Sequence, residues 1–589
     1  MKKLLFWILL IPFVFSSCKD FLDEEMVSDV SYAYYDTEKG LKDLIWSCYT
    51  PLRCIFYRDE IAITLSLFGT DAYRDVGAGG NRMFHRYDAT VDANHAILHS
   101  VWTEYYSGIN SCNIAINRIP KFQNGSDFLK TDEDIKIRES EARFLRAYYY
   151  FFLVQTFGNI PLPIEENISV MTDFKRSPVS KVYQAIISDL RYAEQYLPKK
   201  QSEYGRVTQG AAGHLLSKVY LTRGSAVTDQ RGQKNTDLDS AAYYADKVIN
   251  LGEYRLCDDF AEVFDPDNQK NAEVIFAVQY TTNNIANTTY NFMHRVWLCA
   301  YQQFAGILRS LEGGTSATRM QATDYLMDVF DRRNDSRFYK SYTTVYYCNN
   351  PGAAPKWTAA NAPSPDLVGK PKFGEGDTAL VFSMDKNVPD DVIAKRPYHW
   401  LPRNKFTELY FLPCCLHLDP HRADIEAIDG TRDWFLMRLA ETYLIAAEAY
   451  GRKGDYAKAL EYINKITERA SYKENEKKPS QYYKVEGGSL ADLYKSTKVE
   501  MTVRIESINS PEKLRDFILD ERARELHSEC QRWYDLVRTE TFLDRVQKYN
   551  PNASSNVREY HKLRPIPQLH IDRLSNPGPI EEEQNIGYY

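Results

Sequence analysis

Residues 435–470 have the sequence FLMRLAETYLIAAEAYGRKGDYAKALEYINKITERA. Apolar residues recur at every third or fourth position on both sides of a Gly454-Asp455 step, which predicts two amphipathic helices, the first beginning at Phe435. Gly454 can take the left-handed conformation that ends a helix, and Asp455 can cap the next one. The spacing of Gly454, Asp455, Tyr456 and Ala459 is that of a tetratricopeptide (TPR) helix pair.

One TPR-like pair cannot bury both of its apolar faces alone, so further pairs are expected to stack against it. Amphipathic patterns predict these helices in residues 37–57, 98–119, 133–157, 178–197, 207–223 and 238–251. Near the carboxyl end, one more helix is predicted across 517–537, with Cys530 on its apolar face. The expected fold class is mostly α, with about four TPR-like helix pairs forming a scaffold, a large irregular loop-rich region and a few short strands.

The regular pattern breaks between about residues 257 and 430. Residues 273–280 (EVIFAVQY) predict a short strand, and clusters of Asn, Gly and Pro follow it. Many aromatic residues of this region look exposed. A break of this length inside a helical array usually carries function, so we expect a functional site here.

The first residues predict export. Lys2 and Lys3 precede an apolar run that ends at Phe15, and two serines then precede Cys18. This order is typical of a bacterial lipoprotein signal, in which the cysteine becomes the lipid-carrying first residue. We predict a signal peptide at 1–17, lipidated Cys18 with a flexible tether at 18–36, and a single domain at 37–589. Plain secretion with Cys18 in a disulfide is the alternative.

Composition and charge argue against several classes. The chain of 589 residues is 44% apolar and 26% charged, which is an ordinary globular composition. Its net charge of −7, without a basic stripe, argues against nucleic acid as a partner. Ten cysteines without a CxxC pair, and scattered histidines, indicate neither a zinc site nor a disulfide scaffold. Residues 265–269 (DPDNQ) begin like a calcium loop but lack the Gly and Glu that complete one, so no metal and no cofactor is expected.

The densest charge cluster lies in residues 520–538. Glu521 and Glu525 could be the acid and base of a glycosidase, but the interleaved Arg522 and Arg524 favour ion pairs that fix helix packing. A glycosidase needs two carboxylates that face each other across a cleft, about 5 to 9 Å apart, and nothing in the sequence indicates such a pair. We find no HExxH, GxSxG or nucleotide-binding motif.

Several short motifs follow one another along the chain: CKDFLD at 18–23, EARFLRA at 141–147 with GNIPL at 158–162, GRV at 205–207 with KVYL at 218–221, ERxxEL at 521–526 with RWxDL at 532–536, and LxPIP at 563–567 with QNxGY at 584–588. Taken together and in order, they resemble the SusD/RagB family of lipid-anchored nutrient-binding proteins of the Bacteroidota outer membrane. They span nearly the whole mature chain. One departure is Cys530, at a position where the family commonly has Gly.

The resemblance implies a lipoprotein on the outer face of the outer membrane that captures oligosaccharides and sits as a lid on a SusC-like TonB-dependent transporter. It implies no enzymatic activity. The acidic residues after Cys18 are similar to the signal that sends such lipoproteins to the outside face. A peptide-binding or purely structural lid subunit is the alternative, and a glycoside hydrolase is a less favoured one.

The resemblance also implies where a ligand would bind, because the family's ligand platform draws on an early loop and on aromatic residues of the middle region. Sugar rings stack on aromatic faces, and their hydroxyls bond to Asp, Asn and Arg. Trp102 and Trp533 are predicted to lie on core faces, and for any single candidate a packing role stays open. The candidates are Asp71, Tyr73, Arg82, Tyr87 and Asn94 in the early loop, and Trp297, Tyr301, Trp357 and Trp400 in the middle region.

Overall fold

The computed structural model describes residues 32–589 except 57–59, 78–79, 89–90, 123–124, 126–127, 168, 170, 226–230 and 284–289. The predicted signal peptide and the predicted lipidation site, Cys18, lie outside the described residues. The predicted tether is described only from the short 3-10 helix η2 (Tyr32–Asp36). The division of the chain into leader, tether and single domain stays a prediction.

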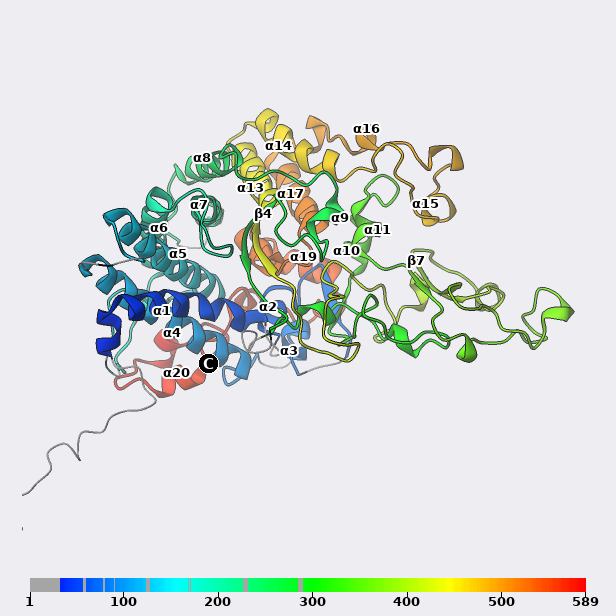
Figure 1. Ribbon diagram of the computed structural model, residues 1–589, viewed down its shortest axis with the longest axis horizontal. Helices are drawn as coiled ribbons and strands as arrows, with labels where there is room; N and C mark the ends of the chain where they lie inside the picture. The colour runs from blue at the N-terminus through cyan, green and yellow to red at the C-terminus, as the bar shows by residue number, and fades with distance from the viewer. Residues whose placement is uncertain are drawn as a thin grey trace, which may run out of the picture.

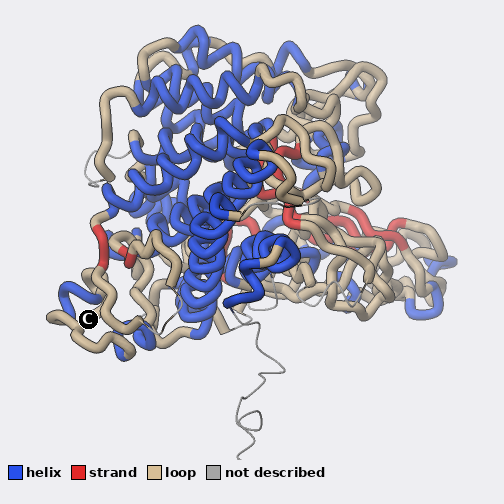
Figure 2. Tube along the Cα trace, turned by 60° about the vertical axis from the view of Figure 1, so that its left-hand side comes forward, coloured by secondary structure: helices blue, strands red, loops and turns tan. Residues whose placement is uncertain are grey.

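The main body is an array of α-helices in which helices that follow one another in the chain pack side by side (Figures 1 and 2). Its members are α1 (Glu38–Tyr49), α4 (Ala96–Arg118), α5 (Asp132–Phe157), α6 (Val179–Tyr196), α7 (Gln209–Arg223), α8 (Asp237–Ile249), α13 (Leu439–Arg452) and α14 (Tyr456–Arg469). Helix α1 packs on α4, α5 on α6, α7 on α8 and α13 on α14. The predicted mostly helical fold with about four TPR-like pairs is confirmed.

Local sequence signals fix where these helices begin. Thr131 and Asp134 form a capping box at the start of α5. Asp455 caps α14 by accepting from the backbone N–H of Lys458 at 3.0 Å, as predicted. Gly454 has φ = +90°, a conformation that glycine adopts at little cost, so the turn between α13 and α14 forms where the sequence places it.

The residues between α8 and α13, termed the insertion (residues 250–438), leave the array and return on a strand. The predicted strand is present as β4 (Val274–Val278), which pairs antiparallel with β9 (Trp434–Arg438). The prediction that a helix begins at Phe435 is therefore wrong, since α13 starts only at Leu439. A short apolar run fits a strand or a helix by pattern alone, and the buried strand β4 needs a partner for its backbone groups.

Part of the insertion forms an arm that extends away from the helical array, around β7 in Figure 1. Its three-stranded sheet has β6 (Val345–Tyr347) antiparallel to β7 (Thr378–Ser383), and β8 (His399–Pro402) parallel to β7. A second, short ladder joins the early loop to the insertion, because β1 (Tyr73–Asp75) pairs with β5 (Met320–Ala322). The early loop and the middle region therefore meet in space.

Cys530 lies in a break of the helix predicted across 517–537. Helix α17 (Pro511–Glu525) ends before it, and α18 (Arg532–Arg538) begins after it, so the predicted continuous helix is wrong. Cys530 has φ = +57°, which is the left-handed region that favours glycine. A glycine at this position would have indicated the break, whereas a cysteine fits the apolar helical pattern. The nine described cysteines are free thiols.

Buried arginines and glutamates join the array to the insertion. Arg438, at the end of β9, donates to Glu273 and to Glu525 of α17, at 2.7 Å each. Glu525 also pairs with Arg337 of α11 (Arg337–Ser341) at 2.7 Å and with Arg469 of α14. All of these side chains are buried. Because a buried charge is costly unless it is paired, each member holds its partners in place. We call these five residues the Glu525 network.

Glu521 and Glu525 form ion pairs, as predicted. Glu521 pairs with Arg337 at 2.8 Å and with Arg524 at 2.7 Å.

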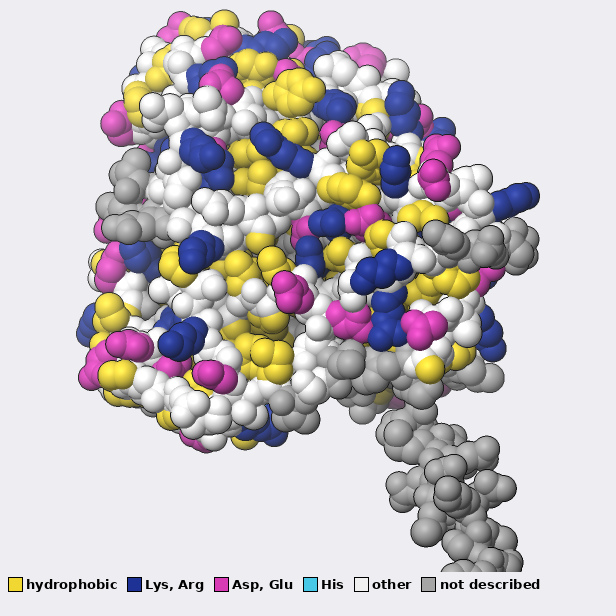
Figure 3. Space-filling model, turned by 90° about the vertical axis from the view of Figure 1, so that its left-hand side faces the viewer, with side chains coloured by type: hydrophobic (Ala, Val, Ile, Leu, Met, Phe, Trp, Pro, Cys, Tyr) yellow, Lys and Arg dark blue, Asp and Glu magenta, His cyan; other side chains and the backbone are white. Residues whose placement is uncertain are grey.

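In the part of the chain that the structure describes, no cluster of His, Cys, Asp or Glu is suited to a metal ion. No helix within those residues has the length and apolar character needed to cross a membrane. On the face shown in Figure 3, basic and acidic side chains are interspersed.

We expect Glu525→Gln to lower the free energy of unfolding by about 3 kcal/mol, because it leaves buried guanidinium groups without their shared carboxylate. Thermal or chemical unfolding of the purified protein measures this effect. The matched control is Glu461→Gln, which removes an exposed partner of Lys458 and should change the free energy by less than about 0.5 kcal/mol. Equal effects of the two substitutions would contradict a structural role for the network.

Candidate functional site

Three of the early-loop candidates lie in the core and not at a surface. Asp71 pairs with Arg532 at 2.6 Å and with Arg545 at 2.7 Å. Burial by itself would raise the pKa of Asp71, but the two guanidinium groups outweigh burial and lower it. Tyr73 and Tyr87 are also buried, and the Tyr87 hydroxyl donates to the Gly69 carbonyl at 3.2 Å. Their predicted ligand contact is corrected to a packing role, because a ligand at the surface does not reach them.

Trp297 and Tyr301 of the middle region are buried as well. The centroids of the Trp297 and His417 rings are 4.7 Å apart, and Trp297 has almost no exposed surface. Tyr301 stacks on Tyr346 at 4.5 Å and donates to the Gly314 carbonyl at 2.6 Å. Tyr73 lies close to Trp297, so the early loop and the middle region are in contact. This contact is inside the protein and not at its surface. Trp297 and Tyr301 are therefore also corrected to packing roles.

Two further candidates remain at the surface of the early loop. Arg82 is the first residue of α3 (Arg82–Arg86), and its partly exposed side chain pairs with Asp75 at 3.2 Å. Asn94 is exposed, and its side-chain amide donates to Asp92 at 3.1 Å. Both side chains keep hydrogen-bonding capacity toward solvent, so both stay proposals as ligand contacts.

The two remaining middle-region candidates, Trp357 and Trp400, lie in the arm. The cationic side chains of Lys372 and Arg396 connect them. Trp357 is buried beneath the ammonium group of Lys372, 4.6 Å from the ring centroid. The same ammonium group donates to the Arg396 carbonyl, and the Arg396 guanidinium lies 4.8 Å from the Trp400 ring. Trp400 is partly exposed, and its indole N–H donates to Ser383 at 2.9 Å. The structure thus places Trp357 and Trp400 near each other, and of the two rings only that of Trp400 is partly exposed to solvent.

A cluster of partly exposed aromatic rings lies where the arm joins the rest of the insertion. Phe304 is 4.8 Å from Tyr410 and 5.3 Å from His399, measured between ring centroids. The three residues come from separate segments, and we call them the aromatic platform. Gly77 of the early loop lies against Glu408, two residues before Tyr410, and a Cβ atom on this glycine would be 2.4 Å from the Glu408 carboxylate.

Hydrogen bonds hold the platform rings in position. The Nε2–H of His399 donates to the Ala305 carbonyl at 2.9 Å, and the Tyr410 hydroxyl donates to Gln303 at 2.8 Å. Burial lowers the pKa of His399, so its ring is neutral at physiological pH and its Nδ1 can accept a hydrogen bond. The sequence predictions missed these residues because they lie in loops without periodicity, where an aromatic residue alone does not indicate exposure.

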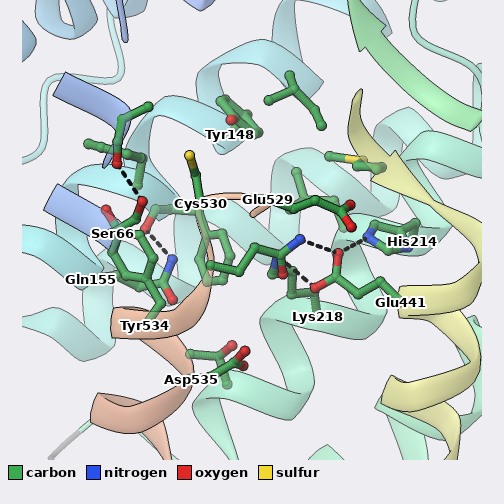
Figure 4. A pocket seen from close by; sticks show the side chains of 18 of the residues that line it. Ser66, Tyr148, Gln155, His214, Lys218, Glu441, Glu529, Cys530, Tyr534 and Asp535 are labelled. Atoms are coloured by element: carbon green, nitrogen blue, oxygen red, sulfur yellow. Dashed lines mark hydrogen bonds and ion pairs between the residues drawn. The ribbon is translucent and has the colours of Figure 1, made fainter. Parts of the chain in front are cut away.

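A cavity of about 100 Å³ lies inside the scaffold, between α5, α7, α13 and α18 (Figure 4). Its polar side is formed around Glu441, which pairs with Lys218 at 2.8 Å and with Arg522 at 2.9 Å, while His214 Nε2 lies 3.2 Å away. Burial alone would raise the pKa of Glu441, but Lys218, His214 and Arg522 hold it well below the ordinary value. The cavity is too small for an oligosaccharide and its charges are paired, so we interpret it as part of the scaffold.

The early loop also carries a buried histidine. His85 of α3 stacks on Phe68, with 3.5 Å between the ring centroids. Burial lowers the pKa of His85 to about 3. Because the unfolded chain binds a proton near the ordinary pKa of about 6.5 and the folded chain does not, the folded state loses stability as the pH falls below that value.

The structure thus combines a helical-repeat scaffold with a long irregular insertion that carries a partly exposed aromatic platform. The chain belongs to the SusD family, whose model matches residues 260–588. A second family model, described as starch-binding associating with outer membrane, matches residues 20–221.

Curated relatives and solved structures agree with this assignment. SusD-like protein P2 of Formosa agariphila is 26% identical, over 100% of this chain and 99% of its own length. Starch-binding protein SusD of Bacteroides thetaiotaomicron is 23% identical, over 78% of this chain and 74% of its own. A structure described as a laminarin-binding SusD-like protein has a TM-score of 0.62 and 20% identity, over 94% of this chain and all of the other, which shows a shared fold.

We expect His85→Phe to reduce the loss of stability on acidification. Between pH 7.5 and pH 5, the parent should lose about 2 kcal/mol through this group alone, whereas a phenylalanine ring has no proton to bind. Unfolding by guanidinium at the two pH values measures the difference. Val499→Phe, at a side chain that is 83% exposed and has no titratable group, is the control and should leave the pH dependence as it is. An unchanged pH dependence in His85→Phe would show that this prediction is wrong.

Proposed function

We propose that this protein is a lipid-anchored binding protein on the outer face of the outer membrane, which captures oligosaccharides and delivers them to a SusC-like TonB-dependent transporter. Membership in the SusD family supports this proposal, as do the names of a starch-binding relative and of a laminarin-binding protein with the same fold. The observation that carries it is the aromatic platform of Phe304, His399 and Tyr410 on the insertion.

The platform has the chemistry that a sugar ring requires. Ring faces of Phe304 and Tyr410 can receive the C–H face of a pyranose, while the neutral imidazole of His399 can accept from a hydroxyl. Trp400 and Arg82 are proposed as further contacts, since both keep exposed surface. Because the rings are already held by hydrogen bonds, a ligand loses little affinity to the ordering of side chains.

The proposal includes no catalytic step. Glu521 and Glu525 are buried and consumed by ion pairs with Arg337, so neither can protonate a glycosidic oxygen or activate water. The platform offers rings and neutral hydrogen-bonding groups. Binding and hand-over of an unchanged glycan is the function that these groups support.

We expect Tyr410→Ala to weaken the binding of a glycan found in a panel of oligosaccharides by about tenfold, which is about 1.4 kcal/mol, because it removes one stacking face. Calorimetry measures the affinity, and the unfolding temperature verifies folding. The control is Tyr243→Ala, which removes a ring of α8 that is 59% exposed and should not change binding. Parent-like affinity in Tyr410→Ala, or binding of peptides and of no glycan, would contradict the proposal.

We expect Cys18→Ser to abolish lipid attachment, because the thiol of Cys18 is the predicted acylation site. Labelling of cells with radioactive palmitate should give a labelled band for the parent and none for the variant. The variant should also be depleted from the outer-membrane fraction, because it lacks the acyl chains that are proposed to hold the parent there. The control is Cys54→Ser, which changes a cysteine other than the predicted acylation site. Continued labelling of Cys18→Ser would exclude this residue as the anchor.

A further inference from the structure

A surface pocket of about 210 Å³ lies on the helical scaffold, away from the insertion. It is formed by α4, by the segment that follows α5, and by α20 (Gln568–Asp572), which lie together at the end of the molecule opposite the arm (Figure 1). We call it the scaffold pocket. Its lining residues are Trp102, Tyr106, Ile109, Asn110, Asn113, Pro161, Pro163, Asn167, Phe174 and His570.

Aromatic rings form the walls of the scaffold pocket. Trp102 lies 4.9 Å from Tyr106 and 4.8 Å from His570, and Phe174 lies 6.5 Å from His570, measured between ring centroids. These residues come from three segments that are far apart in the sequence. Trp102 is 5% exposed, so it agrees with its predicted core position except at the edge that reaches the pocket.

The scaffold pocket also contains unused hydrogen-bonding groups. Among the described residues, no acceptor pairs with the indole N–H of Trp102, a lining residue, and this nitrogen is not among the fully buried unpaired atoms. No described group bonds to the ring nitrogens of His570 either. Burial lowers the pKa of His570 to about 4, so at neutral pH its ring supplies one donor and one acceptor.

The polar rim of the scaffold pocket is fixed. The side-chain amide of Asn110 donates to the Asn167 carbonyl at 2.9 Å, and the Asn167 N–H donates to the Asn110 side-chain oxygen at 3.1 Å. Asn113 donates to the Pro163 carbonyl at 3.0 Å. These bonds tie the segment after α5 to α4, so the walls of the pocket are held open by the fold.

The chemistry of the lining selects the class of ligand. None of the described residues that line the pocket is charged at neutral pH, so they give no attraction for an anion or a cation. An apolar side chain would cover the Trp102 and His570 nitrogens and leave them without partners, at a cost of about 1 to 3 kcal/mol for each group. A neutral sugar ring can stack on the rings and bond to both residues. The volume is below the roughly 300 Å³ of sites for larger ligands, so it suits one ring.

We propose that the scaffold pocket is a second carbohydrate site, which binds one neutral pyranose unit between Trp102, Phe174 and His570. It is separate from the aromatic platform, so it can exist whether or not the platform is the main glycan site. A long glycan that reached both sites would gain affinity through the second contact without any change at the first.

The test uses the full mature chain labelled with 5-fluorotryptophan, in which the fluorine signal of Trp102 is assigned from its disappearance in Trp102→Phe. The probes are neutral methyl glycosides of glucose, galactose and mannose, methyl glucuronide, and N-acetyl-leucine amide. At least one neutral glycoside should shift the Trp102 signal in a saturable manner. In Phe174→Ala, the concentration needed for half of the shift should rise at least tenfold.

Two controls separate this site from the platform. Tyr243→Ala, at an exposed ring outside both sites, should leave the Trp102 response unchanged. Phe304→Ala should also preserve it, even where oligosaccharide affinity falls, because the response belongs to the scaffold pocket. The proposal is overturned if no neutral glycoside shifts the Trp102 signal, if only the leucine amide or the glucuronide does so, or if Phe174→Ala responds as the parent does.

Discussion

The fold depends on the charge of Glu525. This carboxylate receives Arg337 from the insertion, Arg438 from the returning strand β9 and Arg469 from the end of α14. All four side chains are buried, so none of them can exchange its partners for water. The insertion is therefore fixed to the array where the three guanidinium groups converge. The aromatic platform is carried by the same insertion.

Most of the array could be predicted because its sequence signals are local. A helical period, a capping residue and a glycine turn each act within a few residues, as Gly454 and Asp455 do. The secondary-structure predictions were wrong where a partner that is distant in the sequence determines the local conformation. Residues 434–438 are a strand because β4 lies beside them. The helix break at Cys530 could not be predicted because left-handed backbone is normally marked by glycine, and the cost of a cysteine there is met by the surrounding fold.

The sequence indicated the segment of the chain in which the candidate site lies, but it did not indicate which residues of that segment reach the surface. Tyr301 and Phe304 are three positions apart in one loop, yet Tyr301 is stacked inside on Tyr346 while Phe304 reaches the surface. Asp71 has the side chain expected of a sugar ligand, but two arginines from the far end of the sequence enclose it. In segments without periodicity, burial is set by tertiary partners that no local pattern encodes. Residue type therefore indicated the chemistry of the site and not its members.

The buried charges and the exposed rings have complementary roles. Buried carboxylates of the scaffold are paired with several cations each, as Glu441 and Glu525 are. The platform and the scaffold pocket instead present aromatic faces with neutral histidines at their edges. Stacking and neutral hydrogen bonds are weak singly and are little screened by salt, so they need rigid positioning more than they need charge. A scaffold locked by buried ion pairs supplies that rigidity, and this division explains why an insertion of loops can serve as a defined binding surface.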